Sequence, residues 1–488
     1  MKIITASGER PRVLPWRGDA PQACHGQFPP LQGKKGGVIW PDRVEIQVEV
    51  AVVGAGLSGL TAAYHLRDRQ LVVLEAGSQP GGVCLPGSYR GQPYPAGSAY
   101  FYLPEDPQSL SWYQELGLNP EKARVSPPAS ALYQGGNWYP DCFSAQGLVS
   151  LPFPPRVKEE LQRFAGELAE LEETWEPLGS EVLSHPELDQ LSLKQYLEEK
   201  RGFPPELTHY FDPYCRSCLG AGAEDVSAWA ALYFLMSEFS PASRTAAFPE
   251  GNARLVRALA EALPRSVLVQ HTVVDLKNTP GGPHLLVWDA KGRRHFRLAA
   301  AVVILAVGKF VVRRLLGPDC GFDLKAFQAF RYSSYVVAAL CGPLTLEAPG
   351  FENWVAGEPA FSDFILSPRA GSPGGPRVMV LFAPQPYPKG RGRLLARSPG
   401  DQARELLEAV ARHFPGLPAE VEEIHLYRFG HAQVVPYPGF LSLLKSRVKS
   451  RKGRIILAAA DLEGLPCVEA AIIQGEKAAG QAREILGI

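Results

Sequence analysis

The sequence predicts an α/β protein in which a β-α-β domain carries an inserted α+β domain. Three observations favour this fold class. Residues 44–53 form a strand-like apolar run, which a glycine-rich turn and a helix of small residues follow. Residues 267–307 show strand patterns separated by glycine turns, and residues 454–488 return to the strand-turn-helix style of the first segment. The intervening segments are richer in proline, aromatic residues and helices, which indicates a second domain inserted in two pieces.

The domain boundaries follow from these changes in pattern. Residues 1–43 are Pro/Gly-rich and lack a sustained period, so we expect an extended N-terminal arm packed over the surface. We assign residues 44–105, 248–318 and 423–488 to the first domain and residues 106–247 and 319–422 to the inserted domain.

Several elements can be predicted individually. Apolar residues at 3/4 spacing predict an amphipathic helix with the stripe Leu161, Phe164, Leu168, Leu171 and Trp175. Apolar runs separated by PGG and KG turns predict a β-meander over residues 267–276, 284–290 and 295–307. In the second inserted piece we expect strands at 335–340 and 377–383 and a helix at 401–414.

Bulk composition narrows the class of protein. The 488 residues are too many for one compact core, and 50 Lys+Arg balance 50 Asp+Glu, which gives no support for nucleic-acid binding. The longest apolar run, residues 299–307, is far shorter than the roughly 18 residues of a membrane helix. The N-terminus lacks an apolar signal core and the eight cysteines are scattered, so we expect a cytoplasmic protein with free thiols. Peripheral membrane contact and the oligomeric state stay open.

A glycine-rich turn joins the first strand to the first helix. Gly54-Ala55-Gly56-Leu57-Ser58-Gly59 is a G-x-G-x-x-G motif at this junction. Gly54 permits the tight turn, Gly56 lets the backbone approach a pyrophosphate, and Gly59 allows the helix to pack closely on the strand. The free N–H groups and the dipole of the helix N-terminus favour the phosphates. The motif therefore predicts a Rossmann-like nucleotide site.

Two further features indicate which nucleotide binds. Glu75 lies 21 positions after Gly54 at the end of the second strand, where an acid binds ribose hydroxyls and disfavours the 2′-phosphate of NADP. Gly81 and Gly82 follow in LEAGSQPGGV. FAD lies extended across such a domain and needs a second close loop, whereas NAD does not. We therefore expect FAD, and the alternative is that PGG is only a turn.

These motifs together resemble the flavin-containing amine oxidase superfamily, which includes monoamine and polyamine oxidases, protoporphyrinogen oxidase and carotenoid desaturases. The resemblance covers roughly residues 44–105, 248–310 and 454–488, through GAGLSGLTAAYHL, LEAGSQPGG, FPEGNARLVRALAEAL and AAAD…CVEAAIIQGEKAA. The segments YPAGSAYFYLPEDP, DPYCRSCLGAGAEDVSAWAALYF and RFGHAQVVPYPGF are more loosely similar to a group of bacterial FAD-dependent oxidoreductases of unassigned substrate. The resemblance implies a glutathione-reductase-type FAD domain with an inserted substrate domain.

The resemblance also implies roles for particular residues. Gly54, Gly56, Ser58 and Gly59 would hold the pyrophosphate, Glu75 the adenosine ribose and Gly82 the ribityl chain. Gly97 and Ser98 would lie beside the isoalloxazine, and the Val273 backbone would pair with the adenine. Asp461 would bond phosphate or ribityl oxygens, and the Val468 N–H would face flavin O2, where a helix N-terminus stabilises the charge of the reduced ring. The neighbouring Leu57, Ala76, Gly81, Val83 and Cys467 complete the expected cofactor site.

The sequence departs from the family pattern at several positions. Gln79 stands where the family has an arginine for the diphosphate, and Ala460 replaces the usual glycine before Asp461. No cysteine stands at an evident position for a covalent flavin bond, so we expect non-covalent FAD. Cys467 occupies the position of a tyrosine in the aromatic cage of monoamine oxidases, and a thiol cannot supply the aromatic face of such a cage. This departure weakens the expectation of an amine substrate.

Three residues are candidates for catalysis. Lys309 falls near the region where many family members keep a lysine beside flavin N5, although a solvated lysine is the preferred interpretation and Arg314 fits about as well. His431 lies where the chain returns to the flavin domain. Cys467 is more simply a small buried hydrophobic residue than a redox group. Cys215 and Cys218 form a lone CxxC without further metal ligands at zinc spacing, so no metal site is expected.

The sequence thus predicts an FAD-dependent oxidoreductase that transfers hydride from a small organic substrate to flavin N5, with reoxidation by oxygen or another acceptor. An amine or polyamine is the first hypothesis for the substrate. The alternatives are a desaturase or dehydrogenase of an apolar isoprenoid or porphyrinogen, and a flavoprotein that is not catalytic.

Overall fold

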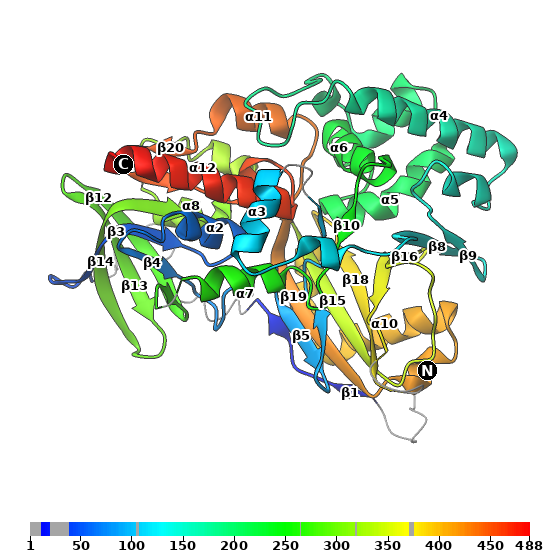
Figure 1. The fold of residues 1–488 in the computed structure, drawn as a ribbon, viewed down its shortest axis with the longest axis horizontal. Helices are drawn as coiled ribbons and strands as arrows, with labels where there is room; N and C mark the ends of the chain where they lie inside the picture. Colours follow the sequence, from blue (N-terminus) through cyan, green and yellow to red (C-terminus); the bar gives the residue numbers. More distant parts are fainter. Residues whose placement is uncertain (1–10, 20–38, 104–106, 264, 318–319, 370–374) are drawn as a thin grey trace.

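The structure is a computed structural model that describes residues 11–19, 39–103, 107–263, 265–317, 320–369 and 375–488. Two sheets form its framework, and helices cover both of them (Figure 1). The α/β fold class predicted from the sequence is confirmed. The remaining residues of the predicted N-terminal arm, 1–10 and 20–38, lie outside the described residues.

The first sheet has a parallel centre extended by a meander. The parallel strands are β3 (Val44–Val53), β4 (Leu71–Leu74), β11 (Val267–Leu268), β14 (Arg294–Leu305) and β21 (Ile455–Leu457). The antiparallel strands are β12 (His271–Thr279), β13 (Gly282–Asp289) and the short β20 (Arg451–Lys452). This arrangement confirms that the beginning, middle and end of the chain build one sheet, and it confirms the predicted meander.

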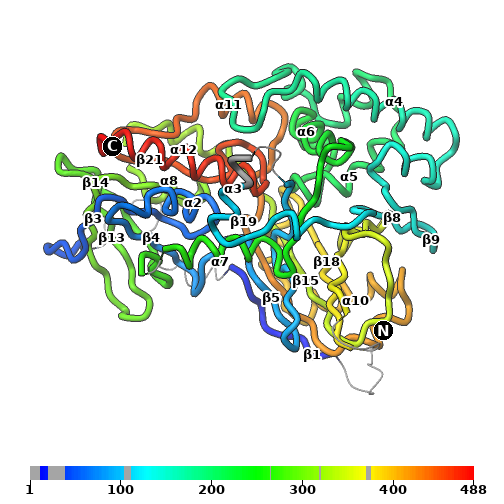
Figure 2. Tube along the Cα trace, viewed as in Figure 1, coloured from blue at the N-terminus to red at the C-terminus, as the bar shows by residue number. Residues whose placement is uncertain are grey.

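Two helices from opposite ends of the chain pack side by side on this sheet. They are α2 (Leu57–His65) and α12 (Val468–Leu486), the blue and red helices of Figures 1 and 2. Gly475 permits this contact, because a Cβ atom there would lie 2.6 Å from the Ser58 carbonyl oxygen. The pairing brings the N-termini of both helices to the same cavity, since Gly56, Leu57, Cys467 and Val468 all line it. Helix α7 (Ala253–Glu261) also packs against α2, and the short α8 (Lys309–Leu315) follows β14.

The second sheet belongs to the inserted domain. Its strands lie in the order β1-β19-β15-β18-β17-β16-β8-β9, and β2 also pairs with β19. The bounds are β1 (Arg12–Val13), β2 (Arg17–Gly18), β8 (Ser130–Gln134), β9 (Asn137–Pro140), β15 (Tyr332–Gly342), β16 (Glu352–Val355), β17 (Asp363–Leu366), β18 (Arg377–Gln385) and β19 (Glu423–Val434). Helices α9 (Gly390–Ala396) and α10 (Pro399–His413) contact this sheet, and the small ladders β5 (Pro86–Tyr89)–β6 (Gln92–Pro95) and β7 (Phe101–Tyr102)–β10 (Thr245–Ala246) lie outside it.

One boundary of the sequence prediction is wrong. Residues 423–434 were expected in the FAD-binding domain, but β19 pairs with β15 and lies in the second sheet. Residues 424–427 of this strand are all buried and residues 430–433 are all half-buried, so burial does not follow a simple alternation. Strand propensity alone fits either sheet, so the sequence could not choose between them. The described part of the N-terminal arm is also more ordered than an extended arm, because β1 and β2 pair with β19 in parallel.

Helices of the inserted domain pack together at one end of the second sheet (Figure 1). They are α4 (Pro155–Glu172), α5 (Pro205–Leu219) and α6 (Ala228–Phe239), while α3 (Pro107–Glu115) and α11 (Phe440–Arg447) lie nearer the first sheet. The predicted stripe is confirmed in its first part, since Leu161, Phe164 and Leu168 are buried in α4. Leu171 is half-buried, and Trp175 lies beyond the end of the helix. Within the described residues, none of the helices has the length and apolar content required to cross a bilayer.

Candidate cofactor and substrate site

A large cavity lies where the two sheets meet, and we call it the main cavity. It has a volume of about 400 Å³. The residues that the sequence predicted and that line it are Gly56, Leu57, Ser58, Gly81, Gly82, Val83, Gly97, Ser98, His431, Asp461, Cys467 and Val468. Gly54, Gly59, Glu75, Ala76, Val273 and Lys309 do not line it.

The glycine motif forms the expected tight turn. Gly54 has a φ of +101°, and a Cβ atom there would lie 2.6 Å from the Ala306 carbonyl oxygen. At Gly59 a Cβ atom would lie 2.0 Å from the Gly54 carbonyl oxygen, so these two glycines serve the turn and the helix packing. At Gly56, by contrast, a Cβ atom would meet nothing within 4 Å. Gly56 therefore faces open space at the uncapped N-terminus of α2, as a phosphate-binding loop requires.

The second glycine pair lies directly against the first motif. The Gly81 N–H donates to the Ala55 carbonyl at 2.9 Å, and a Cβ atom on Gly82 would meet only the Gly56 Cα, at 3.5 Å. A third segment completes this wall, because a Cβ atom on Gly97 would lie 1.9 Å from the Val83 carbonyl oxygen. Three loops distant in sequence thus form one glycine-lined surface that leaves room for an extended dinucleotide.

Glu75 closes the end of this surface. Its carboxylate accepts hydrogen bonds from the Ala55 N–H at 2.8 Å and the Gly77 N–H at 2.7 Å, while burial raises its pKa. The Glu75 carbonyl accepts from the N–H of His271, two residues before Val273. Val273 itself is buried in β12 opposite Val287, so β12 is adjacent to the Glu75 end of the site as the resemblance implies.

Asp461 is held in a buried ion pair with Lys309. The Lys309 Nζ lies 2.5 Å from one carboxylate oxygen, and the Tyr332 hydroxyl donates to the other at 2.6 Å. Lys309 is fully buried, which overturns the preferred interpretation of a solvated lysine. The sequence could not show this, because the partner lies 152 positions away. Lys309 is also not a cavity-lining residue, so it acts on the site through Asp461.

The N-terminus of α12 reaches the opposite side of the main cavity. Cys467 is its N-cap residue and Val468 its first helical residue, and no side chain caps the helix. Burial raises the pKa of the Cys467 thiol well above its ordinary value, which keeps it neutral and argues against a thiolate role. Glu469 follows in the first turn and accepts from the Tyr102 N–H at 3.0 Å. The free N–H groups of α12 therefore face the cavity.

His431 lines the main cavity from β19. Arg391 donates to its Nδ1 at 3.0 Å, and Phe310 stacks on the ring with centroids 3.7 Å apart. Because a guanidinium can only donate, Nδ1 accepts and the proton of the neutral ring resides on Nε2. His431 thus lies at the main cavity, and its candidacy in catalysis stays a prediction.

A cluster of carboxylates at the inserted-domain side of the main cavity was not predicted. It comprises Glu352 of β16 and Asp363 of β17, which are buried and line the cavity, and Glu238 of α6, which is half-buried and does not line it. We call these three residues the acid cluster. Asp363 accepts from Ser217 at 3.0 Å, and Glu238 accepts from the hydroxyls of Tyr102 and Tyr214. Burial raises the pKa of Asp363 to about 7. Burial, together with the charges of Asp363 and Glu238, raises the pKa of Glu352 well above its ordinary value.

The acid cluster has no lysine or arginine as a counterpart among the described residues that line the main cavity, although His431 lines the same cavity. A sequence signal did exist, because Glu352 and Asp363 are charged residues within short strands whose other members are nearly all buried. Burial of a carboxylate costs free energy unless a cation or hydrogen-bond donors accompany it. An acidic residue within a buried strand is therefore a candidate site residue.

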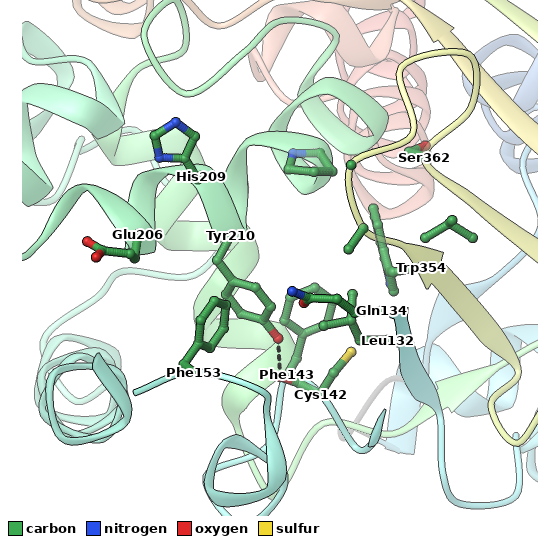
Figure 3. Close-up of a pocket in the computed structure, with 14 residues that line it drawn as sticks. Leu132, Gln134, Cys142, Phe143, Phe153, Glu206, His209, Tyr210, Trp354 and Ser362 are labelled. Atoms are coloured by element: carbon green, nitrogen blue, oxygen red, sulfur yellow. Dashed lines mark hydrogen bonds between the residues drawn. The ribbon is translucent and has the colours of Figure 1, made fainter. Parts of the chain in front are cut away.

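Figure 3 shows a second, smaller cavity, which we call the outer cavity. It is adjacent to the acid cluster, because Ser362 lines it and bonds to Asp363. Its volume is about 240 Å³, and Glu206 and His209 on α5 are exposed beside it. Its lining is largely apolar and includes the aromatic rings of Phe143, Phe153, Tyr210 and Trp354.

The glycine loops, the ribose-side acid and the helix N-termini that converge on one cavity define a dinucleotide-binding protein of the Rossmann-like flavoprotein class. The chain belongs to the flavin-containing amine oxidoreductase family, whose family model matches residues 57–483. It is therefore an FAD-dependent oxidoreductase, as the sequence predicted.

Solved structures share this fold. Putrescine oxidase bound to putrescine is 21% identical with a TM-score of 0.69, and the match covers 91% of this chain and 100% of that chain. Cyclohexylamine oxidase from Brevibacterium oxydans IH-35A is 18% identical with a TM-score of 0.67, covering 90% of this chain and 100% of that chain. A protein described as a putative protoporphyrinogen oxidase, from Exiguobacterium sp. 255-15, is 16% identical with a TM-score of 0.64. The match covers 90% of this chain and 99% of that chain.

One curated relative is similar over a short segment. The coproporphyrinogen III oxidase of Mycobacterium leprae (strain TN) is 39% identical over 108 residues, which are 21% of this chain and 21% of the relative. The matched segment thus spans about a fifth of the relative's length.

The site fits the flavin cofactor that the family implies. The open space at Gly56, the adjoining Gly82 and the uncapped N-termini of α2 and α12 leave room and donors for an anionic dinucleotide. The absence of an arginine at Gln79 leaves the backbone cradle intact. The buried Lys309 is paired with Asp461, which lines the cavity.

Proposed function

We propose that the protein oxidises a small amine that carries a second nitrogen, a diamine or polyamine, with FAD bound non-covalently. The observation that supports this proposal is the acid cluster, of which Glu352 and Asp363 line the main cavity without a lysine or arginine among the described lining residues. The acid cluster therefore favours an amine substrate, although Cys467 stands in place of the cage tyrosine.

A substrate cation is the partner that these carboxylates lack. A buried carboxylate is costly unless a cation or several donors accompany it, and the raised pKa of Asp363 and Glu352 reflects that cost. An ammonium that enters the cavity would favour the ionised form of both acids. Tyr102, Tyr214 and Ser217 already fix the geometry of Glu238 and Asp363, so the cluster is preorganised.

The chemistry indicates that the nitrogen held by the acids is not the one oxidised. Oxidation of a CH–NH unit removes a hydride from carbon and a proton from nitrogen and leaves an imine, which water hydrolyses. The reacting nitrogen must be unprotonated, because its lone pair stabilises the carbon that loses hydride. A carboxylate keeps its nitrogen protonated. A substrate with two nitrogens satisfies both requirements, one at the acid cluster and one at the flavin.

Bound FAD would accept the hydride at N5 and pass the two electrons to dioxygen or another acceptor. The chain's own residues orient the reactants. Gly56, Ser58 and Gly82 would hold the diphosphate and ribityl chain, while Glu75 would hold the ribose. The Val468 N–H, at the N-terminus of α12, would stabilise negative charge at the pyrimidine edge.

The alternatives fit this cavity less well. A porphyrinogen bears several carboxylates, and the acid cluster would repel them. An isoprenoid has no charge that would compensate Glu352 and Asp363 in the cavity. A flavoprotein without catalysis would have no need of a preorganised acid cluster beside the cofactor site.

Anaerobic mixing of the purified holoprotein with an amine panel tests the proposal. We expect 1,4-diaminobutane and spermidine to bleach the oxidised flavin absorbance, and readmitted oxygen or an added acceptor to restore it. Butylamine should bleach it at least tenfold more slowly at equal concentration. A flavin that dithionite reduces but no amine reduces would contradict amine oxidation, and reduction by an apolar polyene would favour the desaturase.

A further inference from the structure

The outer cavity and the main cavity share a single aromatic wall. Tyr214 lines the main cavity, whereas Phe143 and Trp354 line the outer cavity. The Tyr214 ring centroid lies 5.3 Å from that of Phe143 and 5.6 Å from that of Trp354. These distances correspond to direct ring contact, so one layer of side chains separates the two spaces.

A polar link crosses the same wall. Ser362 lines the outer cavity, and its hydroxyl donates at 2.5 Å to Asp363, which lines the main cavity. The acid cluster therefore lies at the boundary between the cavities. An ammonium held by Asp363 would be next to the outer cavity on one side and would have the flavin end of the main cavity on the other.

Helix α5 contributes to both spaces. Tyr210 and Pro213 face the outer cavity, while Tyr214, Ser217 and Cys218 face the main cavity. Pro213 lies inside the helix and lacks an N–H, so the His209 carbonyl loses its helical donor. The ladder of α5 is thus interrupted beside the shared wall, where a small adjustment of the helix would move Tyr214.

We propose that the outer cavity is a second substrate subsite, which binds an apolar substituent on the far nitrogen of the diamine. The proposal rests on the proposed function. Its occupant is an N-alkyl or N-aryl group, because the lining is aromatic and the nitrogen that bears the group is held at the acid cluster beside it. In an N-substituted diamine, the reacting nitrogen would lie at the flavin and the far nitrogen at the acid cluster. The substituent on the far nitrogen would lie in the outer cavity.

A cavity-filling variant tests this subsite. Ala356 is a half-buried turn residue that lines the outer cavity, and Ala356→Phe places a ring in that space. The matched control is Ala290→Phe, at an exposed position after β13. The probes are 1,4-diaminobutane and N-benzyl-1,4-diaminobutane, with kcat/KM measured for each.

We expect Ala356→Phe to lower the ratio of kcat/KM for the benzylated probe to that for the unsubstituted probe at least tenfold, through KM. Ala290→Phe should leave the ratio within twofold. An unchanged ratio in Ala356→Phe would overturn the subsite. Thermal melting of both variants shows whether the substitution disturbed folding, and in that case Gln134→Trp fills the same cavity from β8.

A binding measurement distinguishes failure of the proposed function from failure of the proposed subsite. If the wild-type holoprotein oxidises neither probe, calorimetric titration with N-benzyl-1,4-diaminobutane measures binding directly. Binding that Ala356→Phe weakens tenfold would retain the subsite and reject diamine oxidation. Absence of binding to the wild type would overturn both.

Discussion

At the residue scale, the buried carboxylate of Asp363 lowers the stability of the folded protein, and its charge would favour binding of a cationic substrate. Asp363 is almost fully buried, and its folded-state pKa of about 7 is well above the ordinary 3.8. Between those values the folded protein retains a proton that the unfolded chain has released. Stability therefore falls as pH rises from about 4 to 7 and levels off above 7. Such a residue is retained where ligand binding benefits from its charge.

Asp363→Asn should raise the stability of the folded protein and weaken substrate binding. At pH 8 we expect the free energy of unfolding of the variant to rise by about 1–3 kcal/mol, because no charge is buried. The KM for 1,4-diaminobutane should rise roughly 30- to 100-fold, since a charge-assisted contact is lost. Denaturant unfolding and steady-state kinetics measure the two effects. Asp42→Asn, at an exposed position, should change neither.

The pH dependence of substrate binding follows from the same group. A bound ammonium requires ionised Asp363, so below pH 7 the affinity should fall by up to tenfold per pH unit. The reacting amine also titrates, and the difference between the wild-type and Asp363→Asn profiles isolates the carboxylate. Parallel profiles in the two proteins would contradict the assignment.

Lys309 should matter for cofactor affinity. Lys309→Met leaves Asp461 as an unpaired buried carboxylate, which would repel the FAD diphosphate. We expect the Kd for FAD, measured by flavin fluorescence, to rise at least tenfold. The double variant with Asp461→Asn should recover most of that loss because the uncompensated charge is gone.

The exposed Lys325→Met is the matched control for charge and should bind FAD normally. A purely structural role for Lys309 would predict no recovery in the double variant.

At the scale of elements, the N-terminal arm covers an open sheet edge. β1 and β2 pair with β19, which would otherwise expose its backbone groups. Beyond β2, Asp19 accepts from the Gly430 N–H at 2.6 Å, next to His431. The arm thus fixes the strand that carries His431 into the main cavity.

Gly18→Val should detach this segment. Gly18 has a φ of +84°, and a Cβ atom would lie 2.5 Å from the Arg428 carbonyl oxygen. We expect a local loss of about 1–3 kcal/mol and faster amide hydrogen exchange at Gly430. Gly166→Val in α4, where a Cβ atom meets nothing within 4 Å, is the matched control. Unchanged exchange at Gly430 would contradict the role of the arm.

The elements of the candidate cofactor site could be predicted from the sequence, whereas the acid cluster could not. Gly56, Gly82 and Val468 follow local rules of turns and helix ends, and these rules can be read from a few neighbouring residues. Glu238, Glu352 and Asp363 come from three separate elements, and only the tertiary fold brings α6 near β16 and β17. The same reason explains the error at Lys309, whose environment depends on a residue near the other end of the chain.

At the scale of the whole molecule, FAD should bind without a covalent bond and stabilise both domains. Acid precipitation should leave a colourless pellet and a yellow supernatant. Added FAD at 100 times its Kd should stabilise the apoprotein by roughly 2.7 kcal/mol, seen as a higher Tm. Flavin that stays with the precipitated chain would contradict the non-covalent expectation.

The pairing of α2 with α12 has a consequence for biosynthesis. Gly56 and Val468, which line the same cavity, are separated by about 400 residues. At roughly 5–20 residues per second, a ribosome needs on the order of 20–80 s to make the chain between them. The nascent chain therefore presents only half a nucleotide pocket during that interval. Loading of the flavin must be a post-translational event, and a supply of free FAD at chain release, rather than during elongation, determines the yield of holoprotein.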